Sequence, residues 1–329
     1  MTAPHPPGQL PGMTKPNSAI TLADLKGGGK VALARALAAI EQAPEAPASL
    51  ALLDAAYAAP RAQVVGVTGP PGVGKSTLLG RLIARYRGAG QRVGVIAVDP
   101  SSRRSGGALL GDRIRLVTDP ADDGVFVRSM AARDRLGGLA DLTVGAMVLL
   151  RAVYDRVLIE TVGVGQSETD VASVADTVVF CVQPGSGDAL QFMKAGIVEI
   201  PHIAVVTKAD MGAPATRALA DLKGALSLGA ASDDPDGWAV ATFAVSATRG
   251  DGMDAFAEAL DARAVWLDTA ERLTEARQAR ADLWLREALR DRFGRDGLAR
   301  AAAMSLDIGL APEQSPFSRQ AALAEALRA

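Results

Sequence analysis

The sequence predicts an α/β fold in which a mostly parallel β-sheet is covered by helices, with further helices at both ends of the chain. Two observations support this prediction. Seven short, apolar, β-branched segments alternate with loops and helical patterns, and such segments are typical of parallel strands buried on both faces. Alanine- and leucine-rich helical patterns precede and follow them. The expected strands are residues 64–68, 93–98, 125–128, 157–160, 177–182, 203–207 and 242–245.

Before the first strand, two helices are expected over residues 30–42 and 48–58, joined by a proline-containing turn. They form an N-terminal helical extension, residues 30–60. Residues 1–29 are expected to be a largely disordered lead, because the start of the chain is rich in proline.

The first expected strand runs into the letters GPPGVGKST and then into an apolar-periodic helix. This is GxxxxGKS in the strand–loop–helix context of a phosphate-binding P-loop. The glycines let the backbone curl so that successive amides and the helix N-terminus face one anion. We expect Lys75 to reach the β- and γ-phosphates and act in catalysis, and Ser76 to offer its hydroxyl to Mg²⁺. The predicted nucleotide-binding residues here are Gly69, Pro70, Pro71, Gly72, Val73, Gly74, Lys75, Ser76 and Thr77.

Acidic residues follow two later strands. Asp99 comes directly after the second strand, Asp112 lies further along the same connection, and Glu160 ends the fourth strand, where a Walker-B acid would lie. Because Mg²⁺ takes oxygen ligands, these three carboxylates and Ser76 are the predicted metal ligands, and the three carboxylates are also predicted to act in catalysis. The amide of Gly163 is expected to meet a γ-phosphate. Asp99 could instead cap a turn beside a proline, and Asp112 could be a solvated surface charge.

The base pocket is predicted from the segments VTKAD, residues 206–210, and VSA, residues 245–247. A carboxylate at Asp210 accepts hydrogen bonds from N1–H and the exocyclic amine of guanine, whereas adenine presents an acceptor there. Lys208 can cover the base with its stem. Thr207 replaces the asparagine of the usual NKxD motif, at an expected cost of about 1 kcal/mol in affinity. Ser246 and Ala247 complete the pocket; the alternative is an ordinary solvent-facing turn.

The P-loop domain is expected to end at residue 262, which gives it the bounds 61–262. Residues 263–329 are predicted to be a C-terminal helical extension that mediates dimerisation. It contains one long helix over 264–292, whose apolar stripe needs a covering surface, and a short amphipathic helix over 315–329. The stripe consists of Leu267, Leu273, Leu283, Trp284 and Leu289.

Composition limits the other possibilities. The length of 329 residues and 49% hydrophobic content suffice for about two domains, and a net charge of −2 gives no reason to expect a nucleic-acid partner. The most apolar stretch, 142–159, is interrupted by charges, so no membrane span is expected. With no signal-peptide pattern either, we expect a cytoplasmic protein. The single cysteine, Cys181, lies in an apolar run and is expected to be a buried hydrophobe.

Six strings of the chain together resemble the methylmalonyl-CoA mutase-associated GTPases, also called MeaB or ArgK, over about residues 30–290. They are GPPGVGKST (69–77), VDPSS (98–102), SGGALLGDR (105–113), FVRSM (126–130), LGGL (136–139) and ETVGVGQSE (160–168). The resemblance implies a SIMIBI-class P-loop GTPase with helical extensions, and typically a homodimer. It also implies a GTP-hydrolysing chaperone that gates adenosylcobalamin loading and protects or reactivates a cobalamin-dependent acyl-CoA mutase.

The resemblance further implies Mg²⁺ with GTP or GDP, and a switch loop over residues 183–194 that includes Gln183, Asp188 and Lys194. The alternative for that loop is a plain strand-to-helix connection with Asp188 as an N-cap. Val164 stands where other GTPases carry a water-orienting glutamine, so slow intrinsic turnover is expected.

Two other functions compete with this prediction. An ATP- or GTP-dependent kinase linked to amino-acid transport shares the P-loop, but Asp210 and Ser246 disfavour it. A nickel- or cobalt-inserting GTPase would need soft ligands near the nucleotide, and the chain holds only two histidines and one cysteine.

Overall fold

The computed structural model describes residues 20–99, 119, 121–131, 141–161, 171–185, 200–229 and 237–328. Its centre is a seven-stranded sheet in the order β3-β2-β4-β1-β5-β6-β7, and every neighbouring pair is parallel. All seven predicted strands are confirmed, with small shifts at their ends. They are β1 (Gln63–Thr68), β2 (Val93–Asp99), β3 (Val125–Ala131), β4 (Arg156–Glu160), β5 (Thr177–Val182), β6 (Ile203–Val206) and β7 (Ala241–Ala244).

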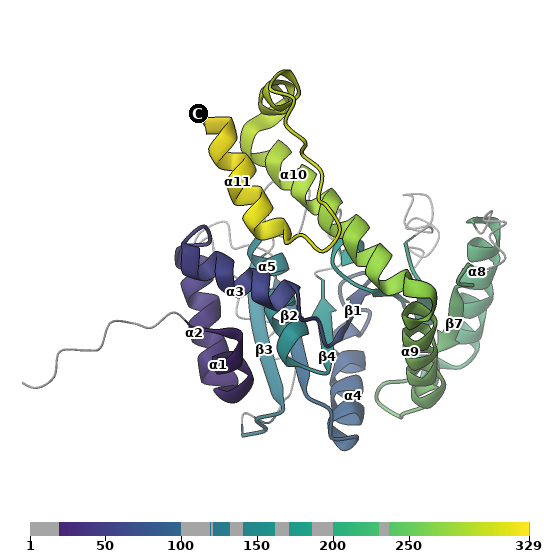
Figure 1. The fold of residues 1–329 in the computed structure, drawn as a ribbon. Helices are drawn as coiled ribbons and strands as arrows, with labels where there is room; N and C mark the ends of the chain where they lie inside the picture. The colour runs from purple at the N-terminus through teal and green to yellow at the C-terminus, as the bar shows by residue number, and fades with distance from the viewer. Residues whose placement is uncertain are drawn as a thin grey trace, which may run out of the picture.

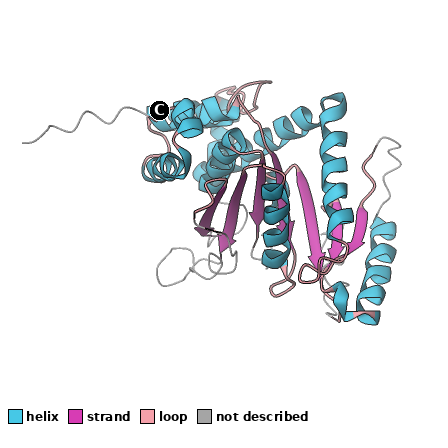
Figure 2. Ribbon diagram, turned by 90° about the horizontal axis from the view of Figure 1, so that it is seen from below, coloured by secondary structure: helices cyan, strands magenta, loops and turns pink. Residues whose placement is uncertain are grey.

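Helices cover both faces of the sheet (Figures 1 and 2). On one face, α4 (Lys75–Gly88) and α9 (Met253–Asp268) pack against side chains such as Val65 and Val179. On the other face, α5 (Asp141–Val153) packs against Val64 and Val178, and α8 (Ala213–Gly229) covers the β5–β6 end. Alternate residues of each strand thus enter different cores, which explains why the strands are apolar throughout.

The N-terminal helices pack against α5 rather than against the sheet itself. They are α1 (Leu22–Gly27), α2 (Gly29–Gln42) and α3 (Pro47–Tyr57), and the last two agree with the expected helices. The helix α1 was not anticipated; a capping box between Thr21 and Asp24 starts it. Because a helix forms there, order begins within the region 1–29 that we expected to be largely disordered.

The predicted single helix over residues 264–292 is wrong, because the chain breaks after α9. A short turn, η4 (Thr269–Glu271), separates α9 from α10 (Arg272–Ala303), and both Ala270 and Glu271 have positive φ, 52° and 59°. The Thr269 hydroxyl donates to the Trp266 carbonyl oxygen at 2.6 Å, which satisfies one of the last carbonyls of α9. No glycine or proline marks this break. The domain boundary expected after residue 262 falls inside α9.

The apolar stripe of α10 is covered mainly by the same chain. The last helix, α11 (Pro316–Arg328), runs alongside α10 (Figure 1), and the rings of Trp284 and Phe317 lie 5.4 Å apart. Leu285 and Leu289 are buried in the same cluster, while Leu283 stays 50% exposed.

Among the described residues, no helix is long and apolar enough to cross a membrane.

Gly66, in the middle of β1, allows the turn η1 (Val171–Ser173) to pack directly on the sheet. A Cβ atom on Gly66 would lie 2.2 Å from Val171 Cγ2 and 3.0 Å from Ala175 Cβ. We therefore expect Gly66→Ala to lower the free energy of unfolding by about 1–3 kcal/mol, because the central strand has no room to move. Chemical denaturation measures this.

The matched control is Gly80→Ala in α4, where a Cβ meets nothing within 4 Å. There the same substitution should raise stability by up to about 1 kcal/mol, as alanine does within a helix. Equal effects at the two positions would contradict the packing argument.

Candidate nucleotide-binding site

The loop between β1 and α4 has the curled backbone that its glycines predict. Gly69, Gly72 and Gly74 have φ values of 137°, 75° and 102°, a region that residues with a Cβ rarely occupy. A Cβ on Gly69 would also lie 2.2 Å from the carbonyl oxygen of Cys181, at the end of β5. The loop can therefore lie this close to β5 only with glycine at position 69.

Lys75 is held inside this loop. It is the first residue of α4 and is only 6% exposed. Its ammonium donates to the carbonyl oxygens of Gly69 at 2.7 Å and Pro70 at 3.1 Å. A positive charge and the amino end of α4 therefore meet at one loop, as an anion site requires.

Two oxygen-bearing side chains meet beside the loop. The Ser76 hydroxyl donates to Glu160 Oε1 at 2.7 Å, and Glu160 is buried at the end of β4. The β1–β4 register, with Val67 opposite Glu160, brings the two together. Hydroxyl and carboxylate oxygens are ligands that Mg²⁺ prefers, so this pair is the described part of the predicted metal site.

The rest of the predicted metal and phosphate group is not described by the structure. Asp99 ends β2, but its side chain lies outside the described residues, as do all of Asp112 and Gly163. Within the described part of the chain, no three histidine, cysteine, aspartate or glutamate side chains gather where they could hold a metal ion.

The predicted base-pocket residues come together beyond β6 and β7. The Ser246 hydroxyl donates to Asp210 Oδ1 at 2.6 Å, and this bond holds the pKa of Asp210 below its usual value. Arg81 of α4 donates to the carbonyl oxygens of Ala247 at 2.6 Å and Thr248 at 2.7 Å. The helix that starts at the P-loop therefore also holds the Ser246–Ala247 segment. We had not predicted a role for Arg81, and no motif marks it.

Thr207 contacts the P-loop, a role that we did not predict. Its buried hydroxyl lies 2.6 Å from the Val73 carbonyl oxygen and 3.0 Å from that of Val182. The Val182 oxygen already accepts the Thr207 amide at 2.8 Å, so the hydroxyl hydrogen is available to Val73. Thr207 thereby fixes the loop to the end of β6. The threonine that stands in place of the usual asparagine therefore has a structural role of its own.

Lys208 joins three predicted segments. Its ammonium donates to the Gly72 carbonyl oxygen at 3.0 Å and to Gln183 Oε1 at 2.5 Å. The P-loop, the base motif and the first residue of the predicted switch loop are thus bonded through one side chain. The other two switch residues, Asp188 and Lys194, lie outside the described residues.

Cys181 is buried in the sheet core, as predicted. Burial raises the pKa of its thiol to about 12. The thiol is therefore protonated near neutral pH and unsuited to act as a nucleophile.

Comparison with known proteins agrees with this geometry. Residues 33–301 match the model of one protein family, described as "Methylmalonyl Co-A mutase-associated GTPase MeaB". A protein of Pyrococcus horikoshii is 43% identical over 78% of this chain and 81% of its own length. The GTPase ArgK of Escherichia coli is 37% identical over 68% of each chain. The solved structure of a LAO/AO transport system kinase superposes with a TM-score of 0.66 and 26% identity, covering 96% of this chain and 100% of the other.

The Thr207 contact predicts a loss of nucleotide affinity when its hydroxyl is removed. In Thr207→Val the buried Val73 oxygen loses its partner, so we expect the free energy of unfolding to fall by about 1–2 kcal/mol. GTP affinity should fall by about three- to tenfold, because the loop is less well ordered before binding. Titration with a fluorescent GTP analogue measures it.

Thr207→Ser is the control, since it keeps the hydroxyl and should bind GTP within about twofold of wild type. If Thr207→Val binds GTP as tightly as wild type does, the contact does not position the loop.

Proposed function

The chain belongs to the family of the methylmalonyl-CoA mutase-associated GTPases, MeaB, and from this premise we propose that it is a chaperone for an adenosylcobalamin-dependent acyl-CoA mutase. In this proposal GTP hydrolysis gates the loading of adenosylcobalamin onto the mutase and protects or reactivates that enzyme. The observation that carries the proposal is the match to this family over residues 33–301, together with a curled P-loop bonded to the predicted base motif.

Guanine selectivity is assigned to Asp210. Its carboxylate is ionised, exposed and oriented by Ser246, so it can accept two hydrogen bonds from guanine. Adenine would place its own acceptor against that carboxylate, which costs on the order of 1–3 kcal/mol. Ala247, held through its carbonyl by Arg81, completes the pocket.

Hydrolysis is assigned to the P-loop and the acidic group. Lys75 would exchange its two loop carbonyls for phosphate oxygens and so bring its charge to the γ-phosphate. Ser76 and Glu160 would hold Mg²⁺, with Asp99 and Asp112 as the further carboxylates, and Gly163 would donate its amide to the γ-phosphate. The metal would supply neutralisation of the charge that develops on the phosphates.

Communication with the mutase is assigned to residues 183–194. Gln183 is bonded to Lys208, which in turn is bonded to the P-loop. A change in the loop on nucleotide binding would therefore act directly on the first residue of the switch segment. Asp188 and Lys194 are proposed to carry the change to the partner.

A homodimer formed through the C-terminal extension, residues 263–329, is also part of the proposal. The three large apolar side chains of this region that stay at least half exposed support it. They are Val265 at 66%, Leu283 at 50% and Met304 at 52%.

The Asp210 assignment predicts the nucleotide preference. GTP should bind at least tenfold more tightly than ATP, and Asp210→Asn should shift the preference toward xanthine nucleotides, whose base presents the complementary hydrogen-bond pattern. Calorimetry with GTP, ATP and XTP measures both. Comparable ATP and GTP affinities would favour an ATP-dependent kinase over the proposed chaperone.

The chaperone assignment predicts that a cobalamin-dependent acyl-CoA mutase accelerates GTP turnover. Coupling of this kind is typically about 5- to 150-fold. Lys194→Ala should keep intrinsic turnover within about threefold of wild type but lose most of the acceleration. The control is Lys223→Ala, which removes an exposed lysine of α8. This variant should retain the acceleration of GTP turnover by the mutase.

Turnover of the wild-type protein that is unchanged by methylmalonyl-, ethylmalonyl- and isobutyryl-CoA mutases would refute the chaperone assignment. Equal acceleration of wild type and Lys194→Ala would refute only the role of Lys194.

A further inference from the structure

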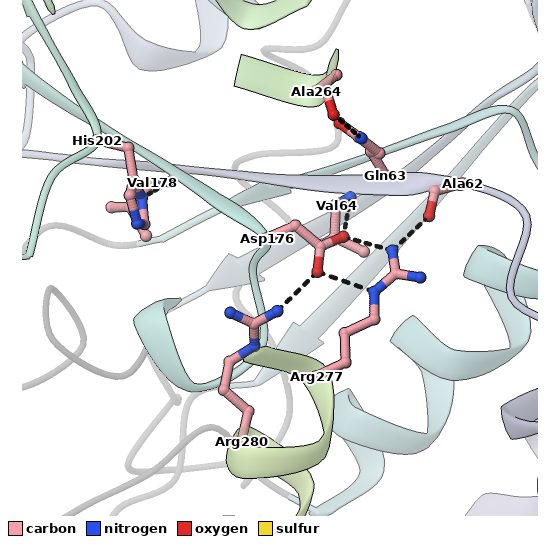
Figure 3. Close-up of polar contacts among 9 residues, drawn as sticks. All are labelled: Ala62, Gln63, Val64, Asp176, Val178, His202, Ala264, Arg277 and Arg280. Carbon is pink, nitrogen blue, oxygen red and sulfur yellow. Dashed lines mark hydrogen bonds and ion pairs between the residues drawn. The ribbon is translucent and has the colours of Figure 1, made fainter. Parts of the chain in front are cut away.

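A buried carboxylate, Asp176, lies at the amino end of β5, and both of its oxygens accept hydrogen bonds from neighbouring residues (Figure 3). Its side chain is 1% exposed and accepts the Val64 amide at 2.9 Å. Arg277 donates to both of its oxygens, at 3.0 and 2.6 Å, and Arg280 donates to one at 2.8 Å. One negative charge thus faces two positive ones, and the carboxylate has little capacity left to pair with a third.

A third arginine lies close by without such a partner. Arg151, near the end of α5, is 5% exposed, and its Nε atom has no hydrogen-bond partner among the described residues. Its guanidinium lies over the ring of Tyr57, with Cζ 5.6 Å from the ring centre. Burial, and then the charge of Arg277, lower its pKa to about 10, so it remains charged at neutral pH. A buried guanidinium without an anionic partner is costly.

The three arginines line one cavity between α3, α5, α10 and α11. The space open to the centre of a water molecule is about 30 Å³, enough for two waters or one small polyatomic group. The side chains of Tyr57, Trp284 and Phe317 line it as well, and none of the described lining residues is acidic. The cavity therefore combines a net positive charge with an apolar, aromatic wall.

The surroundings of a neighbouring histidine, His202, also carry an excess of positive charge. His202 accepts the Val178 amide at Nδ1 (Figure 3). Burial, and then the charges of Arg263 and Arg280, lower its pKa to about 3. It is therefore neutral and adds no charge to the cavity.

We propose that this arginine cavity is a binding site for a small organic carboxylate, with Arg151 as its principal ligand. A carboxylate matches the planar fork of a guanidinium. Its short hydrocarbon part would pack on Trp284 and Phe317, which give an inorganic anion nothing comparable. The cavity lies at the amino ends of β1 and β5, and none of its residues belongs to the nucleotide site. The inference therefore does not rest on the proposed function.

Thermal unfolding of the full chain without nucleotide tests this, with sodium acetate as the probe and sodium chloride at equal concentration as the reference. At about ten times the dissociation constant, acetate should raise the unfolding temperature by about 2–3 °C. Arg151→Met should abolish that rise. Without ligand, Arg151→Met should unfold at or above the wild-type temperature, because it removes an unpartnered buried charge while keeping an apolar stem.

The matched control is Arg263→Met. Arg263 is equally buried, also has guanidinium nitrogens without partners, and lies over the rings of Trp238 and Trp266, but it does not line the cavity. By the same argument Arg263→Met should unfold at or above the wild-type temperature, yet it should keep the full rise with acetate.

Calorimetric titration with acetate provides the second readout, and Arg151→Met should weaken binding at least tenfold. An equal rise in wild type and Arg151→Met, or no rise in wild type, would overturn the proposal. A rise with inorganic phosphate but none with acetate would overturn the ligand class.

Discussion

The attachment of the C-terminal helices to the sheet depends on one buried carboxylate. Asp176 precedes β5, accepts the amide of Val64 in β1, and receives three hydrogen bonds from two arginines of α10. Arg277 also donates to the Ala62 carbonyl oxygen at 2.8 Å, just before β1. Removing the carboxylate would leave two half-buried guanidinium groups without a counter-charge, which costs several kcal/mol. The start of the central strand and the first turns of α10 therefore form one unit.

The other end of β1 is fixed in a different way. The P-loop that follows it is held by Thr207 from the end of β6, by Lys208 and by the close approach of Gly69 to β5. These contacts come from two separate parts of the chain, residues 207–208 after β6 and the end of β5, so the loop is shaped before any nucleotide binds. A preformed loop lowers the ordering cost of binding, and the Thr207 hydroxyl, at the position of the usual asparagine, is one of the groups that give the loop its shape.

How much of this could be predicted from the sequence depends on how local each signal is. The strands and the P-loop were predicted because apolar runs and glycine spacing act over a few residues. The break at Ala270 was not, because two non-glycine residues take positive φ there without a local marker. Asp176 was not singled out either, since its partners lie 101 and 104 residues away and belong to no motif. Thr207 was noted as a departure from a motif, but its bond to Val73 is a tertiary contact. The roles expected of the site residues all stay predictions. For Asp99, Asp112, Asp188 and Lys194 the structure describes no side-chain contact, and for Gly163 it describes no amide contact.

The contacts of Asp176 at the amino end of β1, and those that hold the P-loop at its carboxyl end, limit where the molecule can rearrange. β1 is paired on both sides, with β4 and β5, and Gly66 is packed against η1 without space for a methyl group. A strand held at both ends and along its length cannot slide, so the distance between the arginine cavity and the P-loop is fixed by the sheet. A rearrangement on nucleotide binding is therefore confined to segments that leave the carboxyl edge of the sheet. Gln183 begins one of these segments and is bonded to the P-loop through Lys208, which is the contact that the proposed switch would use.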